Sequence, residues 1–262
     1  MNDAGRSEAS PTVAACQMAV ADLDVEANLD AVVERVAGLP PETDVAVFPE
    51  YALTGFVADE RVDSVALPRD GSVLARLRDV AADADCALLV GFVEAAGDGL
   101  YNAVAYLDPD GRTTVYRKRH LWARERAVLD SGRERVTVET PVGTTGLLTC
   151  YDLNFVGESA AFARLEIDAL FVVGAWPAAH SQNWELLLRA RALDGVRWVV
   201  GAGRTGEKSV GDPTAYAGRS RVVRPDGSVQ AGLNRAERDL VADLDPAVLA
   251  ECREFIPIHE DG

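Results

Sequence analysis

Three side chains in this 262-residue sequence stand in local contexts that suit catalysis. Cys150 ends an apolar stretch and is followed by polar turn residues, so a strand would aim the sulfur while the turn leaves it accessible. Glu50 directly follows an apolar run and a proline, where a carboxylate could accept a thiol proton and later return it. Lys118 could stabilise the negative charge of a tetrahedral intermediate. Together they offer a nucleophile, a base and a group that could stabilise negative charge.

Each of these residues also has an ordinary structural explanation. Cysteine is among the most frequently buried residue types, so Cys150 could be a core residue. Glu50 is one of 42 acidic residues, and Lys118 lies between two arginines that could form a basic surface cluster with it. Against this, the chain has only two lysines, Lys118 and Lys208, and otherwise uses arginine. A compact ammonium kept at position 118 is therefore informative, because guanidinium does not replace it.

The order Glu, Lys, Cys and all three contexts resemble the motifs of the nitrilase superfamily. The sequence reads FPEYALTGF at 48–56, YRKRHLW at 116–122 and CYDLNF at 150–155. Similar segments continue with AWP at 175–177, NWELLLRARA at 183–192 and YAGRSRVVRPDG at 216–227. The resemblance extends over residues 12–257, nearly the whole chain.

This resemblance implies an α/β fold, an α-β-β-α sandwich of two mixed sheets flanked by helices, and pairing into homodimers or larger homo-oligomers. It also implies a cysteine-dependent hydrolase of non-peptide carbon–nitrogen bonds, in which Glu50, Lys118 and Cys150 form and hydrolyse a thioester without a cofactor. Glu125 matches a second family glutamate that could position substrate or assist proton transfer. The backbone N–H of Tyr151 would complete the oxyanion hole beside Lys118.

The substrate pocket is expected around Tyr51, Asn154, Trp176 and Arg204. Asn154 stands where several branches of the family that act on carboxylate substrates have arginine, which argues against recognition of an acidic substrate at that position. Trp176 could equally be a core tryptophan, and Arg204 could equally form a structural salt bridge.

The favoured substrate is a small linear amide or N-carbamoyl compound. Nitrile hydrolysis and N-acyl transfer to an amine use the same thioester and remain alternatives. A non-catalytic interaction protein on the same scaffold is the alternative from a different class. A Ser-His-Asp hydrolase is disfavoured because the sequence has no G-x-S-x-G motif.

The composition limits the partners. A net charge of −16 and a pI of about 4.6 argue against nucleic acid or an anionic membrane surface, and the acidity resembles that of proteins from salt-loving organisms. No run of about 20 apolar residues suggests a membrane span, and no secretory signal is evident, so we expect a cytoplasmic protein. Four scattered cysteines and three scattered histidines indicate neither a disulfide scaffold nor a metal site.

These catalytic candidates must be held by alternating strands and helices. We expect residues 1–11 to be a flexible tail and residues 12–262 to form one domain without a linker. Apolar periodicity predicts helices at 25–36 with Asp24 as N-cap, from Ser72 onward with Ser72 as N-cap, and at 180–196 with Leu186, Ala190 and Leu193 on one apolar face. Apolar and β-branched runs predict strands at 13–18, 45–49, 86–93, 102–107, 113–117, 136–138, 146–149, 170–173, 198–202, 219–223 and 240–244. Two mixed sheets with helices outside accommodate this pattern.

Overall fold

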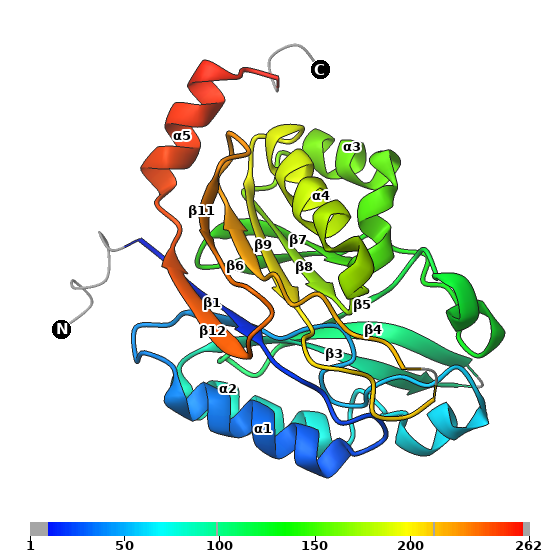
Figure 1. The fold of residues 1–262 in the computed structure, drawn as a ribbon. Helices are drawn as coiled ribbons and strands as arrows, with labels where there is room; N and C mark the ends of the chain where they lie inside the picture. The colour runs from blue at the N-terminus through cyan, green and yellow to red at the C-terminus, as the bar shows by residue number, and fades with distance from the viewer. Residues whose placement is uncertain (1–9, 98, 212, 259–262) are drawn as a thin grey trace.

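Two six-stranded sheets stack face to face, with helices on the outer face of each, in the computed structural model of the chain (Figure 1). The structure describes residues 10–97, 99–211 and 213–258. The predicted α-β-β-α sandwich is confirmed.

Both sheets follow the same plan, with three adjacent parallel strands, two antiparallel strands on one side and a single antiparallel strand on the other. The order in the first sheet is β12 (Arg238–Asp243), β1 (Thr12–Gln17), β2 (Val45–Val47), β3 (Ala87–Ala96), β4 (Gly99–Leu107) and β5 (Thr113–Arg117). The order in the second sheet is β6 (Thr137–Thr140), β7 (Gly143–Thr149), β8 (Ala169–Gly174), β9 (Trp198–Gly203), β10 (Arg221–Val223) and β11 (Val229–Gly232).

Helices cover both outer faces, and short 3-10 helices follow several strands. In Figure 1, α1 and α2 lie under the first sheet, α3 and α4 lie over the second, and α5 projects from the body. The α-helices are α1 (Val25–Gly38), α2 (Ser72–Ala84), α3 (Val156–Arg164), α4 (Ser181–Leu193) and α5 (Pro246–Phe255). The 3-10 helices are η1 (Glu60–Val65), η2 (Ala123–Ala127), η3 (Cys150–Asn154) and η4 (Ala178–His180).

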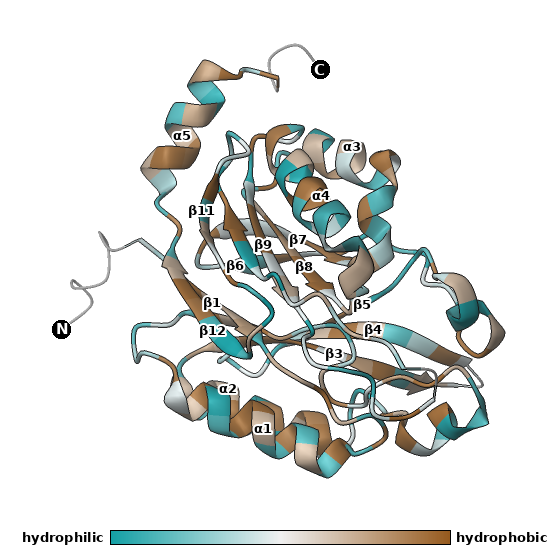
Figure 2. Cartoon of the chain, viewed as in Figure 1, coloured by the Kyte–Doolittle hydropathy of each residue, from teal (hydrophilic) through white to brown (hydrophobic). Residues whose placement is uncertain are grey.

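Strand β1 shows how the sequence builds two core layers. Its side chains alternate between the faces of the sheet, as the two-residue period of a strand requires. Val13 and Ala15 join the core between the sheets, whereas Ala14 and Cys16 join the core between the first sheet and helices α1 and α2. Figure 2 shows hydrophobic residues along β1, β3 and β8, the strands that both layers bury.

Helix α4 differs from its prediction in the face it buries. Leu186 and Leu193 are 63% and 47% exposed, and Trp184 and Leu188 are buried instead. The indole of Trp184 lies directly over the glycine at the end of β8, where a Cβ on Gly174 would come within 2.8 Å of the ring. The larger apolar area of tryptophan therefore sets the rotation of the helix.

Other element predictions are partly corrected. Asp24 caps α1 as expected, accepting the Ala27 N–H at 3.1 Å. Ser72, predicted as a cap, is the first helical residue of α2, and Gly71 occupies the cap position without a side-chain bond. Helices α3 and α5 were not predicted.

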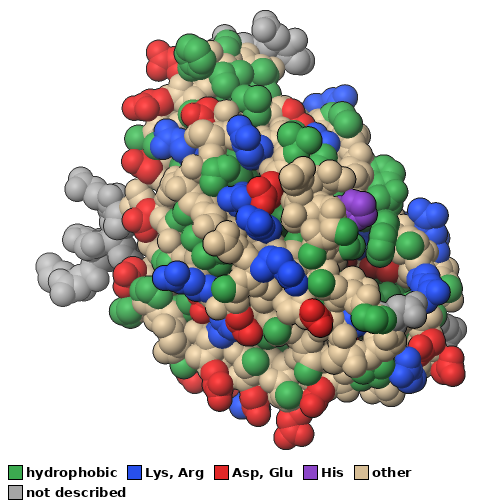
Figure 3. All heavy atoms as spheres, in the orientation of Figure 1, with side chains coloured by type: hydrophobic (Ala, Val, Ile, Leu, Met, Phe, Trp, Pro, Cys, Tyr) green, Lys and Arg blue, Asp and Glu red, His purple; other side chains and the backbone are tan. Residues whose placement is uncertain are grey.

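The predicted tail at 1–11 lies mostly outside the described residues, but Pro11 is buried and its carbonyl accepts the Leu244 N–H at 2.8 Å. Among the described residues, no helix is both long and apolar enough to cross a membrane. Figure 3 shows acidic side chains gathered along the edge formed by α1 and α2, and basic side chains across the middle of the same face.

Candidate active site

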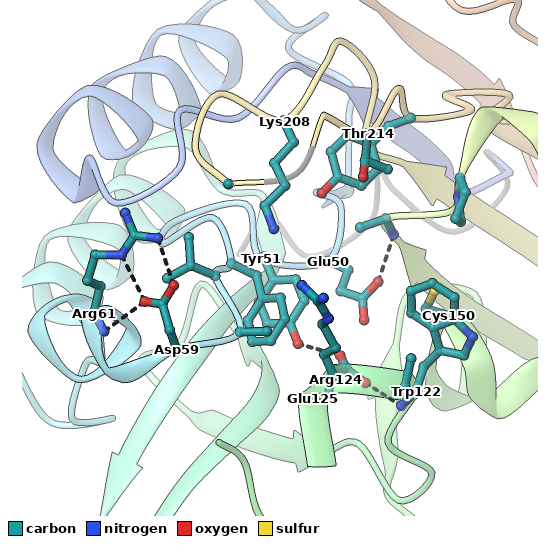
Figure 4. A pocket seen from close by; sticks show the side chains of 18 residues that line it. Glu50, Tyr51, Asp59, Arg61, Trp122, Arg124, Glu125, Cys150, Lys208 and Thr214 are labelled. Atoms are coloured by element: carbon teal, nitrogen blue, oxygen red, sulfur yellow. Dashed lines mark hydrogen bonds and ion pairs between the residues drawn. The ribbon is translucent and has the colours of Figure 1, made fainter. Parts of the chain in front are cut away.

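The structure brings the three predicted catalytic residues together at strand ends. Glu50 follows β2, Lys118 follows β5, and Cys150 begins η3 directly after β7. The Lys118 Nζ atom donates to Glu50 Oε1 at 2.8 Å, and both side chains are almost fully buried. Glu50 and Cys150 line one wall of a cavity of about 520 Å³ (Figure 4).

The backbone around Glu50 fixes its carboxylate from two sides. Strand β3 passes so closely that a Cβ on Gly91 would lie 2.8 Å from the Glu50 Cα atom, so only glycine fits there. At the end of β8, the Ala175 N–H donates to Glu50 Oε2 at 2.7 Å. The donor is a backbone amide, so this hydrogen bond does not depend on which side chain stands at position 175.

Lys118 lies between two carboxylates. Its Nζ atom donates to Glu125 Oε1 and Oε2 at 3.0 and 2.9 Å, in addition to the bond with Glu50. Burial alone would lower the pKa of Lys118, but the negative charges of Glu50 and Glu125 outweigh it and raise that pKa well above its usual value. The ammonium is therefore charged throughout the physiological pH range.

Glu125 is an ionised carboxylate whose two oxygens are occupied. Oε1 accepts from the Tyr51 hydroxyl, and Oε2 accepts from the Trp122 N–H at 2.6 Å. Burial favours protonation, but the charge of Lys118 and these hydrogen bonds outweigh it and hold the pKa of Glu125 below its usual value.

Asn102 joins the two carboxylates, and the sequence analysis did not identify it as a site residue. Its Nδ2 atom donates to Glu50 Oε1 at 2.8 Å, to Glu125 Oε1 at 2.9 Å and to the Tyr51 hydroxyl at 2.8 Å. The residue is fully buried, and its Oδ1 atom has no hydrogen-bond partner among the described residues. An asparagine within a predicted apolar strand was the only signal in the sequence.

The backbone at Cys150 is strained. Its φ of +47° lies in the left-handed region, which costs a non-glycine residue about 1 kcal/mol or more and is often found at functional sites. Burial raises the pKa of the Cys150 thiol well above its usual value, the charge of Glu50 raises it further, and Lys118 partly offsets this. The resting group is therefore a neutral thiol, and a base must remove its proton before it can react.

A buried aspartate ties the cysteine turn to the lysine segment. Asp152 Oδ2 accepts from the Tyr116 hydroxyl at 2.6 Å and from the Thr149 N–H at 3.1 Å. Its Oδ1 accepts from the His120 N–H at 3.0 Å. Burial raises the pKa of Asp152 to about 6, and these hydrogen bonds limit the rise. In the sequence analysis Asp152 is only one position of the CYDLNF motif, and the structure identifies its hydrogen-bond partners.

The residues predicted for the pocket lie in three different places. Tyr51 lines the larger cavity. Asn154 and Trp176 line a second cavity of about 250 Å³, which shares four lining residues with the first: Trp122, Cys150, Ala175 and Pro177.

Arg204 lines neither of these two cavities. It pairs with Asp22 at 2.9 Å, lies under the ring of Tyr216 at 4.2 Å, and is 1% exposed. The structural salt bridge is therefore the better interpretation of Arg204.

The charged groups Glu50, Lys118 and Glu125 are paired with one another. Within the described residues, no three His, Cys, Asp or Glu side chains are grouped so as to hold a metal ion. The arrangement that remains is a buried thiol beside a carboxylate and an ammonium. This set can transfer a proton, form a covalent acyl intermediate and stabilise an oxyanion.

Comparison with known proteins agrees with this chemistry. The model of the carbon-nitrogen hydrolase family matches residues 12–254. An (R)-stereoselective amidase from Pseudomonas sp. is 32% identical over 229 residues, covering 87% of this chain and 83% of the relative. The omega-amidase YafV from Escherichia coli K12 is 33% identical over 244 residues, covering 92% of each chain.

Solved structures share the fold over nearly its whole length. A CN-hydrolase superfamily protein from Xanthomonas campestris, XC1258, superposes with a TM-score of 0.89 at 29% identity, covering 97% of each chain. Saccharomyces cerevisiae Nit3, a member of the nitrilase superfamily, gives 0.86 at 26% identity and covers 95% of each. This chain therefore belongs to the carbon–nitrogen hydrolase family, in the amidase-like branch of the nitrilase superfamily, and acts on amide-type carbon–nitrogen bonds.

Proposed function

We propose that the protein hydrolyses a small linear amide or N-carbamoyl compound through a thioester on Cys150. The observation that carries the proposal is the Lys118 ammonium, which is held between the carboxylates of Glu50 and Glu125 at the wall where Cys150 reaches the cavity. The amidase names of two relatives support the amide class.

Acylation begins with a neutral thiol. Glu50 accepts the Cys150 proton as the sulfur attacks the carbonyl carbon, so the C–S bond forms as the carbonyl π pair moves to oxygen. Lys118 and the backbone N–H of Tyr151 stabilise this oxyanion. When the intermediate collapses, Glu50 returns the proton to the departing nitrogen, and ammonia or an amine leaves.

Deacylation uses the same groups a second time. Glu50 accepts a proton from water as the water oxygen attacks the thioester carbon, and Lys118 again faces the oxyanion. Collapse breaks the C–S bond, and the proton held by Glu50 returns to the sulfur. An amide gives a carboxylic acid and an N-carbamoyl compound gives a carbamic acid that loses CO2 to leave the free amine. In both cases the original thiol is restored, so no oxidant or cofactor is required.

Glu125 has a positioning role in this proposal. Its oxygens are occupied by Lys118, Tyr51 and the Trp122 amide, and its low pKa keeps it ionised at neutral pH. An anion with fully used acceptors holds the ammonium in place and is poorly suited to donate a proton.

The test is ammonia release from linear amides, ω-amides, N-carbamoyl compounds and nitriles, in low and multimolar KCl. Wild type is compared with Cys150→Ala, which removes only the sulfur. We expect turnover of one amide class, with kcat reduced by about 10⁴-fold or more in the variant, while urea unfolding shows that the variant remains folded. An absence of Cys150-dependent turnover at both salts would point to acyl transfer or a binding role, and alkylation of Cys150 no faster than that of the other three cysteines would favour the binding role.

Homodimer formation and a cytoplasmic location stay predictions from the sequence. For the first, the outer face of α3 and α4 offers exposed apolar side chains, among them Leu165, Leu186 and Leu193.

A further inference from the structure

Lys208 is a cation in the cavity that the proposed mechanism does not use. It is one of only two lysines in a chain with 42 acidic residues, and its side chain lines the same cavity as Cys150. In Figure 4 the side chain descends from its loop with the ammonium facing the space between Tyr51 and Glu50. No hydrogen bond or ion pair engages this ammonium within the described part of the chain. Lys208 is half-exposed at the cavity, and a cation there without a counter-ion suits an anionic ligand.

The other charges at the cavity mouth are already engaged. Asp59 binds Arg61 through two bonds, from Nε at 2.8 Å and Nη2 at 2.7 Å, which hold the pKa of Asp59 at about 2. Lys208 is close enough to lower that pKa slightly, but it forms no bond to the carboxylate. Arg124 also lines the cavity and is not free. Of the three cations that line the cavity among the described residues, Lys208 is therefore the one available to a ligand.

The backbone of Lys208 is held firmly, so its ammonium is presented from a fixed point. The Lys208 N–H donates to the Thr214 carbonyl at 2.8 Å, which closes the loop on itself. The next residue, Ser209, donates its N–H to Asp22 Oδ2 at 2.9 Å, which anchors the loop to the buried Asp22–Arg204 pair.

We infer that Lys208 determines specificity by binding a carboxylate of the substrate, a short chain away from the scissile carbonyl. The inference deepens the proposed function and rests on it, because it concerns the far end of the same amide. A compact cavity of about 520 Å³ is about 10 Å across, which fits a short acyl chain ending in a carboxylate. The carboxylate can belong to the acyl part, as in a dicarboxylic acid monoamide, or to the amine part, as in an N-carbamoyl amino acid.

This inference changes one expectation from the sequence. Asn154 argued against recognition of an acidic substrate at its own position, and the structure places it in the second cavity, away from Lys208. Lys208, on a different loop, would then bind the carboxylate.

The test compares charged and uncharged substrates of equal length. Glutaramate is paired with valeramide for a carboxylate in the acyl part, and N-carbamoyl-β-alanine with propylurea for a carboxylate in the amine part. In Lys208→Met we expect kcat/KM for the charged member of the preferred pair to fall about 10- to 100-fold, mainly through KM. The uncharged member should change by less than about threefold. Lys208→Arg, which keeps the charge, should retain most of the preference.

Arg76→Met is the matched control, because Arg76 lies on α2 in an exposed ion pair with Asp30 and its loss changes the net charge equally. Equal losses on both members of each pair in Lys208→Met, or no loss on either, would overturn the inference. Wild-type turnover of valeramide that depends on Cys150 establishes the proposed function separately. If wild type hydrolyses none of these compounds, the proposed function fails, and protection of Cys150 from iodoacetamide by glutarate still decides the inference. Protection in wild type but not in Lys208→Met would support it, and equal protection or none would overturn it.

Discussion

Two groups of buried charged side chains adjoin the cavity, and they differ in what their charges face. In the first, Lys118 binds Glu50 and Glu125, and Glu50 reaches the cavity wall beside the thiol of Cys150. In the second, Arg204 binds Asp22 behind that wall, with the ring of Tyr216 between the guanidinium and the cavity.

The hydrogen-bond partners of Asp22 and Glu50 explain why the first is structural and the second is the proposed base. Asp22 is used entirely by the chain, since its oxygens accept from Arg204 and from the Phe56 and Ser209 amides, which hold loops of the cavity wall. Glu50 is also bonded on both oxygens, but it lies beside a thiol whose proton it can take. Of these two buried ion pairs, only the one that contains Glu50 has a thiol beside it at the cavity wall.

The largest expected effect comes from Glu50→Gln, which removes the proposed base and leaves Lys118 paired with Glu125. We expect kcat to fall about 10²- to 10⁴-fold. The free energy of unfolding should fall by only about 1–3 kcal/mol. The reason is that one of the buried N–H groups that now donate to Glu50 would face the NH2 group of the new side-chain amide. Steady-state amide hydrolysis and urea unfolding measure the two quantities.

Alkylation of Cys150 gives this prediction an internal control. Because the charge of Glu50 raises the pKa of the thiol, its removal should lower that pKa and shift the alkylation profile to lower pH. Faster alkylation together with slower turnover would identify Glu50 as the base. Unchanged turnover would remove Glu50 from the mechanism.

Arg204→Met should have the opposite balance of effects from Glu50→Gln, with a large loss of stability and a small change in kcat. Removing one partner of a buried pair leaves Asp22 charged without its cation, which should cost about 3–5 kcal/mol of unfolding free energy. At low temperature, where the variant is folded, kcat should stay within about threefold of wild type, because Arg204 does not touch the cavity. KM should rise, since Ser209 and the Lys208 loop lose a firm anchor at Asp22.

A second substitution tests whether the unpaired charge of Asp22 causes the loss of unfolding free energy. Asp22→Asn in the Arg204→Met background should recover part of the unfolding free energy, because it removes the uncompensated carboxylate. A drop in kcat as large as that of Glu50→Gln would show instead that the two groups are not separate in function.

The sequence predicted the helices and strands of the fold well where a short stretch of residues contains the whole signal. The two-residue alternation in β1 and the Asp24 cap of α1 are local features, and both occur as expected. The buried face of α4 was wrong, because leucines spaced seven residues apart indicate a stripe but not which large side chain finds a gap in the sheet. Helix α3 has nine residues and begins next to a glycine, so its period is too short to detect.

Within the candidate site, motif resemblance predicted residues and the fold supplied their partners. The Glu50, Lys118 and Cys150 positions were predicted, and the structure places them together. The bonds of Asn102 to Glu50 and of Asp152 to Tyr116 join residues 52 and 36 positions apart. No single-sequence pattern encodes such pairs, because they depend on how separate strands lie in the sheets.

The smallest expected effect comes from Tyr51→Phe, which removes one hydrogen bond to Glu125 at the edge of the first group. Burial and the charge of Glu125 raise the pKa of Tyr51, so its hydroxyl is a donor at every working pH. We expect a loss of about 1–2 kcal/mol of unfolding free energy at neutral pH and a fall in kcat of only a few fold, because Lys118 and Asn102 still hold Glu125.

The pH dependence of this loss distinguishes an electrostatic role from simple packing. A carboxyl whose pKa is lower in the folded than in the unfolded chain stabilises the fold above its ordinary pKa, which is 4.5 for Glu125, and loses that contribution as the pH falls through the folded value. Tyr51→Phe raises the folded pKa, so the difference from wild type should be full above pH 4.5 and should shrink as the pH falls through the two folded pKa values, that of the variant first. Urea unfolding from pH 7 down to the lowest pH at which both proteins remain folded measures it. A difference that stays constant over this range would mean that the hydroxyl contributes packing alone and does not help keep Glu125 ionised beside Lys118.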